Sequence, residues 1–164
     1  MPDSIRQYGR CLILIAAAGL SACASTGIAP GSEVEETPRV YSPEQAAQWS
    51  SKGKLAHEQG DIAGAVDAWQ QAVKFNPADA VTVNNLALVL QQQHRFSEAA
   101  RVLKQGVEAS PGTAELHYNL AVISELYLLD LESALVHYQR YQALAPEEDT
   151  MVAGWIADLE RRLQ

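Results

Sequence analysis

The chain has 164 residues, of which 48% are hydrophobic and 20% are charged, as is typical of a globular protein with one domain and additional segments. Its formal net charge of −8 argues against a nucleic-acid partner, because phosphate contacts need clustered Lys and Arg. No stretch reaches the roughly eighteen apolar residues of a membrane-spanning helix, so we expect no permanent transmembrane helix.

The first residues have the pattern of an export signal. Arg6 and Arg10 precede the apolar run "CLILIAAAGL", residues 11–20, which is too short to cross a bilayer comfortably. The run ends in "LSAC", residues 20–23, which resembles the lipobox of bacterial lipoproteins. This resemblance implies that a signal peptide, residues 1–22, is removed. It also implies a diacylglycerol on the Cys23 sulfur and an acyl chain such as palmitate on its amino group. An ordinary secretory signal with a chance cysteine is the alternative.

The predicted lipid anchor also suggests a location. Without the signal, Cys23 is the only cysteine and has no intramolecular disulfide partner. Two or three acyl chains anchor a protein stably, since each buried methylene contributes ~0.8 kcal/mol. Residue 24 is Ala rather than Asp. By resemblance to lipoprotein sorting in enteric bacteria, this implies an outer-membrane protein that faces the periplasm.

A tether follows the anchor. Residues 23–42 are rich in Ser, Thr, Gly, Pro and Glu and show no hydrophobic period, so we expect a flexible spacer after the lipidated Cys23. Order is predicted to begin at "SPEQ", residues 42–45. In this segment Ser42 would be the N-cap, Pro43 the first helical residue and Gln45 the third residue of a capping box.

The remaining chain repeats itself. The segments 60–77, 94–111 and 129–146 are alike, and their final prolines, Pro77, Pro111 and Pro146, are 34 and 35 residues apart. This period and the matching positions resemble the tetratricopeptide repeat (TPR) family. The matching residues are Trp49, Gly53, Gly60, Ala65, Trp69, Ala72 and Pro77; Leu86, Ala87, Ala99, Gly106 and Pro111; and Leu120, Ala121, Ala134 and Pro146.

The resemblance implies an all-α fold for residues 43–164. Three helix-turn-helix units, at about 46–79, 80–113 and 114–148, would form a right-handed α-solenoid, and a helix at about 149–163 would cap it. A partner-binding role for that last helix is the alternative. Two departures concern the turns: His94 replaces the turn glycine, and the third unit has an extra residue, which we place within 127–132.

Catalytic patterns are weak in this sequence. The histidines share no metal-ligand spacing, and His117 and His137 fall on packed helix positions. Ser51 and Lys54 match S-x-x-K, but the companion motifs of penicillin-recognising enzymes are absent. We therefore expect no enzyme activity, metal, cofactor or small-molecule substrate.

A TPR array offers a concave surface lined by the first helix of each unit. By resemblance, the candidate groove residues are Lys54, Asn84, Asn85, Leu88, Gln92, Tyr118, Asn119 and Val122. Asn85 and Asn119 occupy the same repeat position, where TPR proteins bond the ligand backbone; solvated asparagines are the alternative. The wider set of groove positions holds one cation, Lys54, and the acidic Glu58, Glu115 and Glu125, so a basic or neutral partner is expected.

These features together predict a lipid-anchored periplasmic TPR adaptor for a partner protein or peptide. Small TPR lipoproteins of this kind resemble pilotins and assembly factors of type IV pili and secretion systems. A scaffold for cell-wall (peptidoglycan) enzymes is one alternative. A self-assembling structural lipoprotein that forms homodimers is another. Fold alone does not choose among them.

Overall fold

The computed structural model describes residues 41–145, 147 and 149–164. The predicted signal peptide, Cys23 and the tether up to residue 40 lie outside the described residues, as does the repeat residue Pro146. Within the described part, no helix combines the length and apolar character needed to cross a membrane.

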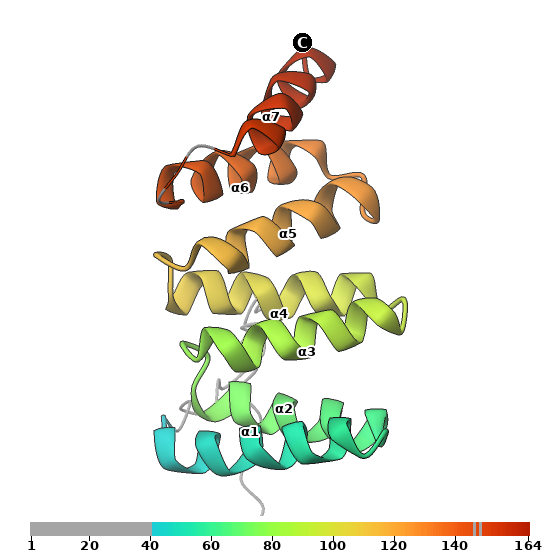
Figure 1. Cartoon of the computed structure of the whole chain (residues 1–164), viewed down its shortest axis with the longest axis vertical. Coiled ribbons are helices and arrows are strands. Elements are labelled where there is room, and N and C mark those ends of the chain that lie inside the picture. The colour runs from blue at the N-terminus through green and yellow to red at the C-terminus, as the bar shows by residue number, and fades with distance from the viewer. Residues whose placement is uncertain (1–40, 146, 148) are drawn as a thin grey trace, which may run out of the picture. The chain divides into compact units, whose positions relative to one another are not determined.

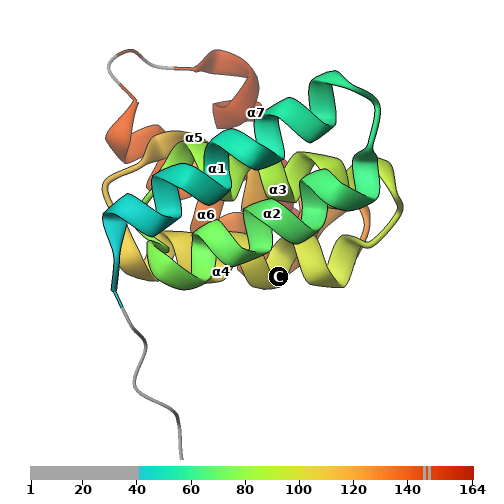
Figure 2. The same cartoon turned by 90° about the horizontal axis from the view of Figure 1, so that it is seen from below.

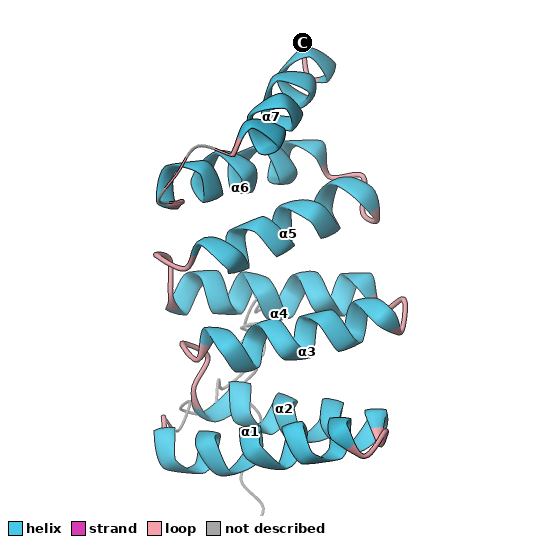
Figure 3. Ribbon diagram, in the orientation of Figure 1, coloured by secondary structure: helices cyan, strands magenta, loops and turns pink. Residues whose placement is uncertain are grey.

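Seven α-helices account for the described residues, and no strand occurs among them (Figure 3). The helices stack in chain order as antiparallel pairs (Figure 1). Seen along the stack, α1, α3 and α5 form one layer and α2, α4 and α6 the other (Figure 2). The predicted all-α fold of three helix pairs and a capping helix is confirmed. The bounds are α1 Pro43–Glu58, α2 Ile62–Phe75, α3 Ala80–Gln92, α4 Phe96–Ala109, α5 Ala114–Leu126, α6 Leu131–Leu144 and α7 Thr150–Arg162.

The helix starts depend on aspartates more than on the predicted capping box. Asp61, Asp79 and Asp130 each accept a hydrogen bond from a backbone N–H in the first turn of the helix that follows. Such bonds satisfy N–H groups that have no partner inside the helix. The capping box predicted at α1 is wrong: α1 does begin at Pro43, but the Ser42 side chain makes no cap bond. The Ser42 backbone N–H instead donates to the Phe75 carbonyl, 3.0 Å away, and ties the start of α1 to the end of α2.

Small residues let the helices approach closely. Ala65, Ala99 and Ala134 occupy equivalent positions in α2, α4 and α6, and all three are fully buried. Larger apolar side chains fill the space between units in two clusters. The first cluster runs from α2 to α5, and the second joins α5, α6 and α7. Two clusters in series are what a repeat array predicts, because each unit packs only on its neighbours.

The turns within the three units share one backbone conformation. Gly60, His94 and Leu129 all have left-handed φ angles, of 78°, 59° and 55°. Glycine adopts this conformation freely, whereas other residues are strained in it. The extra residue of the third unit lies in this turn, which spans 127–130, whereas the earlier turns span 59–61 and 93–95. Despite the insertion, the left-handed residue still directly precedes the N-cap residue, Asp130, as in the first two units.

Replacing Leu129 with glycine is expected to raise the free energy of unfolding by about 0.5–1 kcal/mol, because a left-handed leucine costs roughly 1–2 kcal/mol and glycine returns part of this as chain entropy. Little packing is lost, since the Leu129 side chain is 75% exposed. Urea denaturation measures the change. Leu128→Gly is the matched control, because Leu128 has no positive φ and its replacement should lower stability. If both variants lost the same free energy of unfolding, backbone strain at Leu129 would be excluded.

Candidate functional site

A pocket of about 270 Å³ opens between α1 and α3, on the layer that the sequence predicts to be concave. Its floor includes Trp69, which is 3% exposed and belongs to α2. The Trp69 indole Nε1–H donates to the Ser50 carbonyl at 3.2 Å, which fixes the ring beneath α1. Gly53 makes this approach feasible, because α1 has no side chain at the point of contact. The lining residues are Lys54, His57, Glu58, Trp69, Asn85, Leu88, Val89 and Gln92.

The pocket combines an apolar centre with an amide and charged rim. Leu88 is 40% exposed although it is a large aliphatic residue, and Val89 beside it is buried. Lys54 and Glu58 lie one helical turn apart on α1, with 3.9 Å between the Lys54 Nζ and a Glu58 carboxylate oxygen. Both side chains are well exposed, so this pair contributes little stability. Its effect is to leave the rim close to neutral.

The predicted asparagines divide into two roles. The Asn119 side-chain amide on α5 donates to the Asn84 side-chain oxygen on α3, so these two residues join neighbouring units. Asn85 lines the pocket instead. The cause is helical geometry, because each residue turns the side chain by about 100°. Sequence spacing aligned Asn85 with Asn119, but the contact across units pairs Asn119 with Asn84.

Tyr118 and Val122 lie beneath the capping helix. Both pack against the second core cluster, which contains Val152 and Leu159 of α7. The Tyr118 ring centroid is 6.4 Å from that of Trp155, also on α7. A further contact joins the ends of the two helices, where Arg162 of α7 lies 3.4 Å from a Glu125 oxygen of α5. The capping helix therefore packs over Tyr118 and Val122, two of the predicted groove residues on α5.

Of the eight predicted groove residues, the structure brings four together at the pocket: Lys54, Asn85, Leu88 and Gln92. Sequence reasoning did not assign Trp69 or Val89 to the site. Trp69 was recognised as a repeat aromatic, and its spacing from Gly53 was the available signal. A glycine on one helix that faces a tryptophan on the paired helix predicts that the two helices approach closely. The indole ring can then reach past the first helix to the pocket on its other side.

Two histidines form a pair away from the pocket, and His117 is buried whereas His137 is half-buried. The Nδ1 atoms of His117 on α5 and His137 on α6 are 3.0 Å apart, and His117 Nε2 lies 3.2 Å from the Pro111 carbonyl oxygen. Since that carbonyl can only accept, His117 carries its proton on Nε2, and His137 donates to the His117 Nδ1. Burial lowers the pKa of both imidazoles, and nearby Lys104 lowers the pKa of His137 further. Both histidines lie in the packed positions that the sequence indicates.

The described residues contain no group of three or more His, Cys, Asp or Glu side chains that could hold a metal ion. The His117–His137 pair therefore has no third ligand among them, and its chemistry is hydrogen bonding between neutral rings. The pocket between α1 and α3 presents amides, a weak ion pair and apolar surface. Such a surface suits recognition of a polypeptide, whose backbone pairs with amides and whose side chains occupy apolar hollows.

Comparison with known proteins identifies the repeat. Residues 53–94 match the family model described as TPR repeat, and residues 84–149 match the one described as Tetratricopeptide repeat. Together the matches cover more than half of the chain. The Hsp70-Hsp90 organizing protein of Triticum aestivum is 29% identical over 116 residues, or 71% of this chain and 20% of that protein. The chain thus spans about a fifth of the length of this relative.

Solved structures share the architecture. The first TPR domain of Spaghetti (RPAP3), bound to the HSP90 peptide SRMEEVD, has a TM-score of 0.62 at 19% identity, covering 77% of this chain and 98% of that one. MamA from Desulfovibrio magneticus RS-1 has a TM-score of 0.56 at 21% identity, covering 71% and 65%. These likenesses show the fold. The two repeat matches, which together span residues 53–149, show that this chain contains tetratricopeptide repeats.

Proposed function

We propose that this protein is an adaptor that binds an extended or helical segment of a partner protein in the pocket between α1 and α3. The observation that carries the proposal is the half-exposed Leu88 beside the Trp69 floor, with Asn85 and Gln92 at the rim. An exposed aliphatic residue over a buried aromatic is favourable surface for a partner's side chain. The two amides supply donors and acceptors for a peptide backbone.

The partner segment is proposed to be neutral or basic. A TPR structure similar to this one was solved with the acidic peptide SRMEEVD. The pocket described here has one cation, Lys54, and it lies beside Glu58. A carboxylate-rich ligand would find no unopposed positive charge at this rim. Electrostatic complementarity therefore argues against transferring that ligand to this chain.

The proposed location is the outer membrane, facing the periplasm, through lipid on Cys23. The support is the sequence pattern of residues 1–24, and the role in type IV pilus or secretion-system assembly is an analogy with small TPR lipoproteins. Metabolic labelling with a radioactive palmitate tests the anchor. Cys23→Ser should abolish labelling and move the protein from the membrane fraction to the soluble one. Equal labelling of both forms would exclude Cys23 as the acylated residue.

Site-specific photo-crosslinking in native membranes tests the pocket. A benzophenone side chain at Leu88 should yield one dominant adduct, and Asn85→Ala with Gln92→Ala should remove it, because the rim then lacks the amides that hold the peptide backbone. The same group at Val136, which is 60% exposed on α6, is the matched control and should not trap that partner.

The identity of the adduct decides among the three functional alternatives. A secretin or pilus protein supports the assembly role, and a peptidoglycan enzyme supports the scaffold role. Adducts between copies of this chain alone would support self-assembly. An adduct that persists in the doubly substituted protein, or that forms equally from residue 136, would contradict pocket binding.

A further inference from the structure

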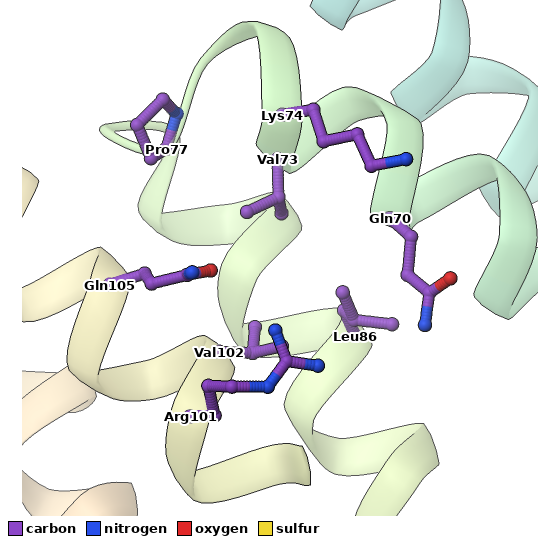
Figure 4. Close-up of a pocket in the computed structure, with 8 residues that line it drawn as sticks. All are labelled: Gln70, Val73, Lys74, Pro77, Leu86, Arg101, Val102 and Gln105. Carbon is purple, nitrogen blue, oxygen red and sulfur yellow. The ribbon is translucent and has the colours of Figure 1, made fainter. Parts of the chain in front are cut away.

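A second and larger pocket lies on the other helix layer. It encloses about 320 Å³ between α2 and α4, and its floor is apolar. Val73, Leu86 and Val102 form this floor, and Pro77 closes one end (Figure 4). None of its lining residues is shared with the pocket between α1 and α3. The two pockets are therefore separate surfaces of the same array.

Two cations line the same hollow. Figure 4 shows Lys74 of α2 and Arg101 of α4 on different walls of the hollow, with the amides of Gln70 and Gln105 between them. Both cationic side chains are exposed, and neither makes an ion pair within the part of the chain that the structure describes. The hollow thus combines positive charge, amide groups and aliphatic surface.

The acidic residue of α4 that is nearest to Arg101 in sequence already has another partner. Glu98 lies one turn before Arg101, but both of its carboxylate oxygens accept hydrogen bonds from Arg95, at 2.7 and 2.8 Å. This bidentate arrangement satisfies the carboxylate and lowers the pKa of Glu98. The charge of Arg101 also lowers the pKa of Glu98, but among the described residues Arg101 makes no ion pair with that carboxylate and remains exposed. Although the chain has a net charge of −8, two exposed cations from different helices line this one hollow.

We propose that this second pocket binds an acidic segment of a partner protein in which an aliphatic residue is flanked by carboxylates. The aliphatic side chain would occupy the hollow above Val73 and Val102. The flanking carboxylates would face Lys74 and Arg101, because a planar guanidinium and an ammonium are the side chains that best bind carboxylates. The volume suits one side chain and adjoining backbone, at the lower end of the range for binding pockets. The protein would then hold two partner segments of opposite charge character on opposite layers.

Fluorescence anisotropy with a labelled peptide, SGELEEGS, tests the proposal on the purified chain at low salt. Arg101→Glu should weaken binding at least about tenfold, because it places a like charge opposite the peptide carboxylates. Lys104→Glu is the matched control: Lys104 is exposed on the same helix, one turn on, and lies outside the pocket lining. It makes the same change in net charge, and affinity should change less than about twofold.

Two altered peptides complete the test. Replacing the glutamates by glutamine, or the leucine by alanine, should each weaken binding, since the pocket offers both charge and apolar floor. Equal losses from Arg101→Glu and Lys104→Glu would overturn the proposal in favour of general charge attraction. Binding unaffected by Arg101→Glu would overturn it as well. The double substitution Asn85→Ala with Gln92→Ala should leave this peptide bound. The proposal for the α2–α4 pocket can therefore fail or succeed independently of the proposal for the α1–α3 pocket.

Discussion

Replacing Gly53 with alanine is expected to lower the free energy of unfolding by about 1–2 kcal/mol, although alanine is the better helix former by about 1 kcal/mol. An added Cβ at residue 53 would lie 2.5 Å from two ring atoms of Trp69, closer than such atoms approach. The indole cannot retreat easily, because it is buried and bonded to the Ser50 carbonyl. The helices α1 and α2 must therefore separate, and overpacking outweighs the gain in propensity.

The same substitution at Gly154 should have the opposite sign. Gly154 lies within α7, and an added Cβ there meets no atom within 4 Å. Gly154→Ala is expected to raise the free energy of unfolding by up to about 1 kcal/mol, the difference in helix propensity alone. Urea denaturation of both variants measures the contrast. If Gly53→Ala were as stable as Gly154→Ala, the close approach of α1 to Trp69 would not be what holds the pocket floor.

Acidification is expected to destabilise the protein through the His117–His137 pair. Burial keeps the pKa of both imidazoles below the ordinary value of 6.5, and Arg140 and Lys104 act in the same direction. The His117 hydrogen bond to the Pro111 carbonyl and the charge of Asp130 oppose this shift. Below pH 6.5 the unfolded chain therefore binds protons that the folded one does not. The free energy of unfolding should be highest above that pH and fall as the pH drops, by up to about 1.4 kcal/mol per pH unit for each histidine.

Chemical denaturation at several values between about pH 7.5 and pH 5.5 tests this, in a range where few carboxylates titrate. His137→Gln is the informative variant. Its amide retains a donor for the His117 Nδ1 but does not titrate, so the pH dependence should become shallower while the pair remains bridged. A flat wild-type profile would contradict the prediction, and an unchanged slope in His137→Gln would assign the acid sensitivity to other groups.

Much of the fold was accessible from sequence because its determinants are local. The 34-residue period located the helix pairs, and small residues such as Ala65 and Ala99 indicated where helices touch. Such positions repeat because the two helices of each unit pack against each other in the same way. The extra residue of the third unit was predicted within 127–132, and the structure places it in the turn 127–130.

The sequence alone therefore determined the architecture and the layer on which Lys54, Asn85, Leu88 and Gln92 lie. Only the tertiary structure decided which residues share a surface. It paired Asn119 with Asn84. It also placed α7 over Tyr118 and Val122, and brought Lys74 and Arg101 to one hollow from different helices. The physical reason is that a helical period fixes a side chain's direction on its own helix, whereas contacts between units depend on how neighbouring helices pack.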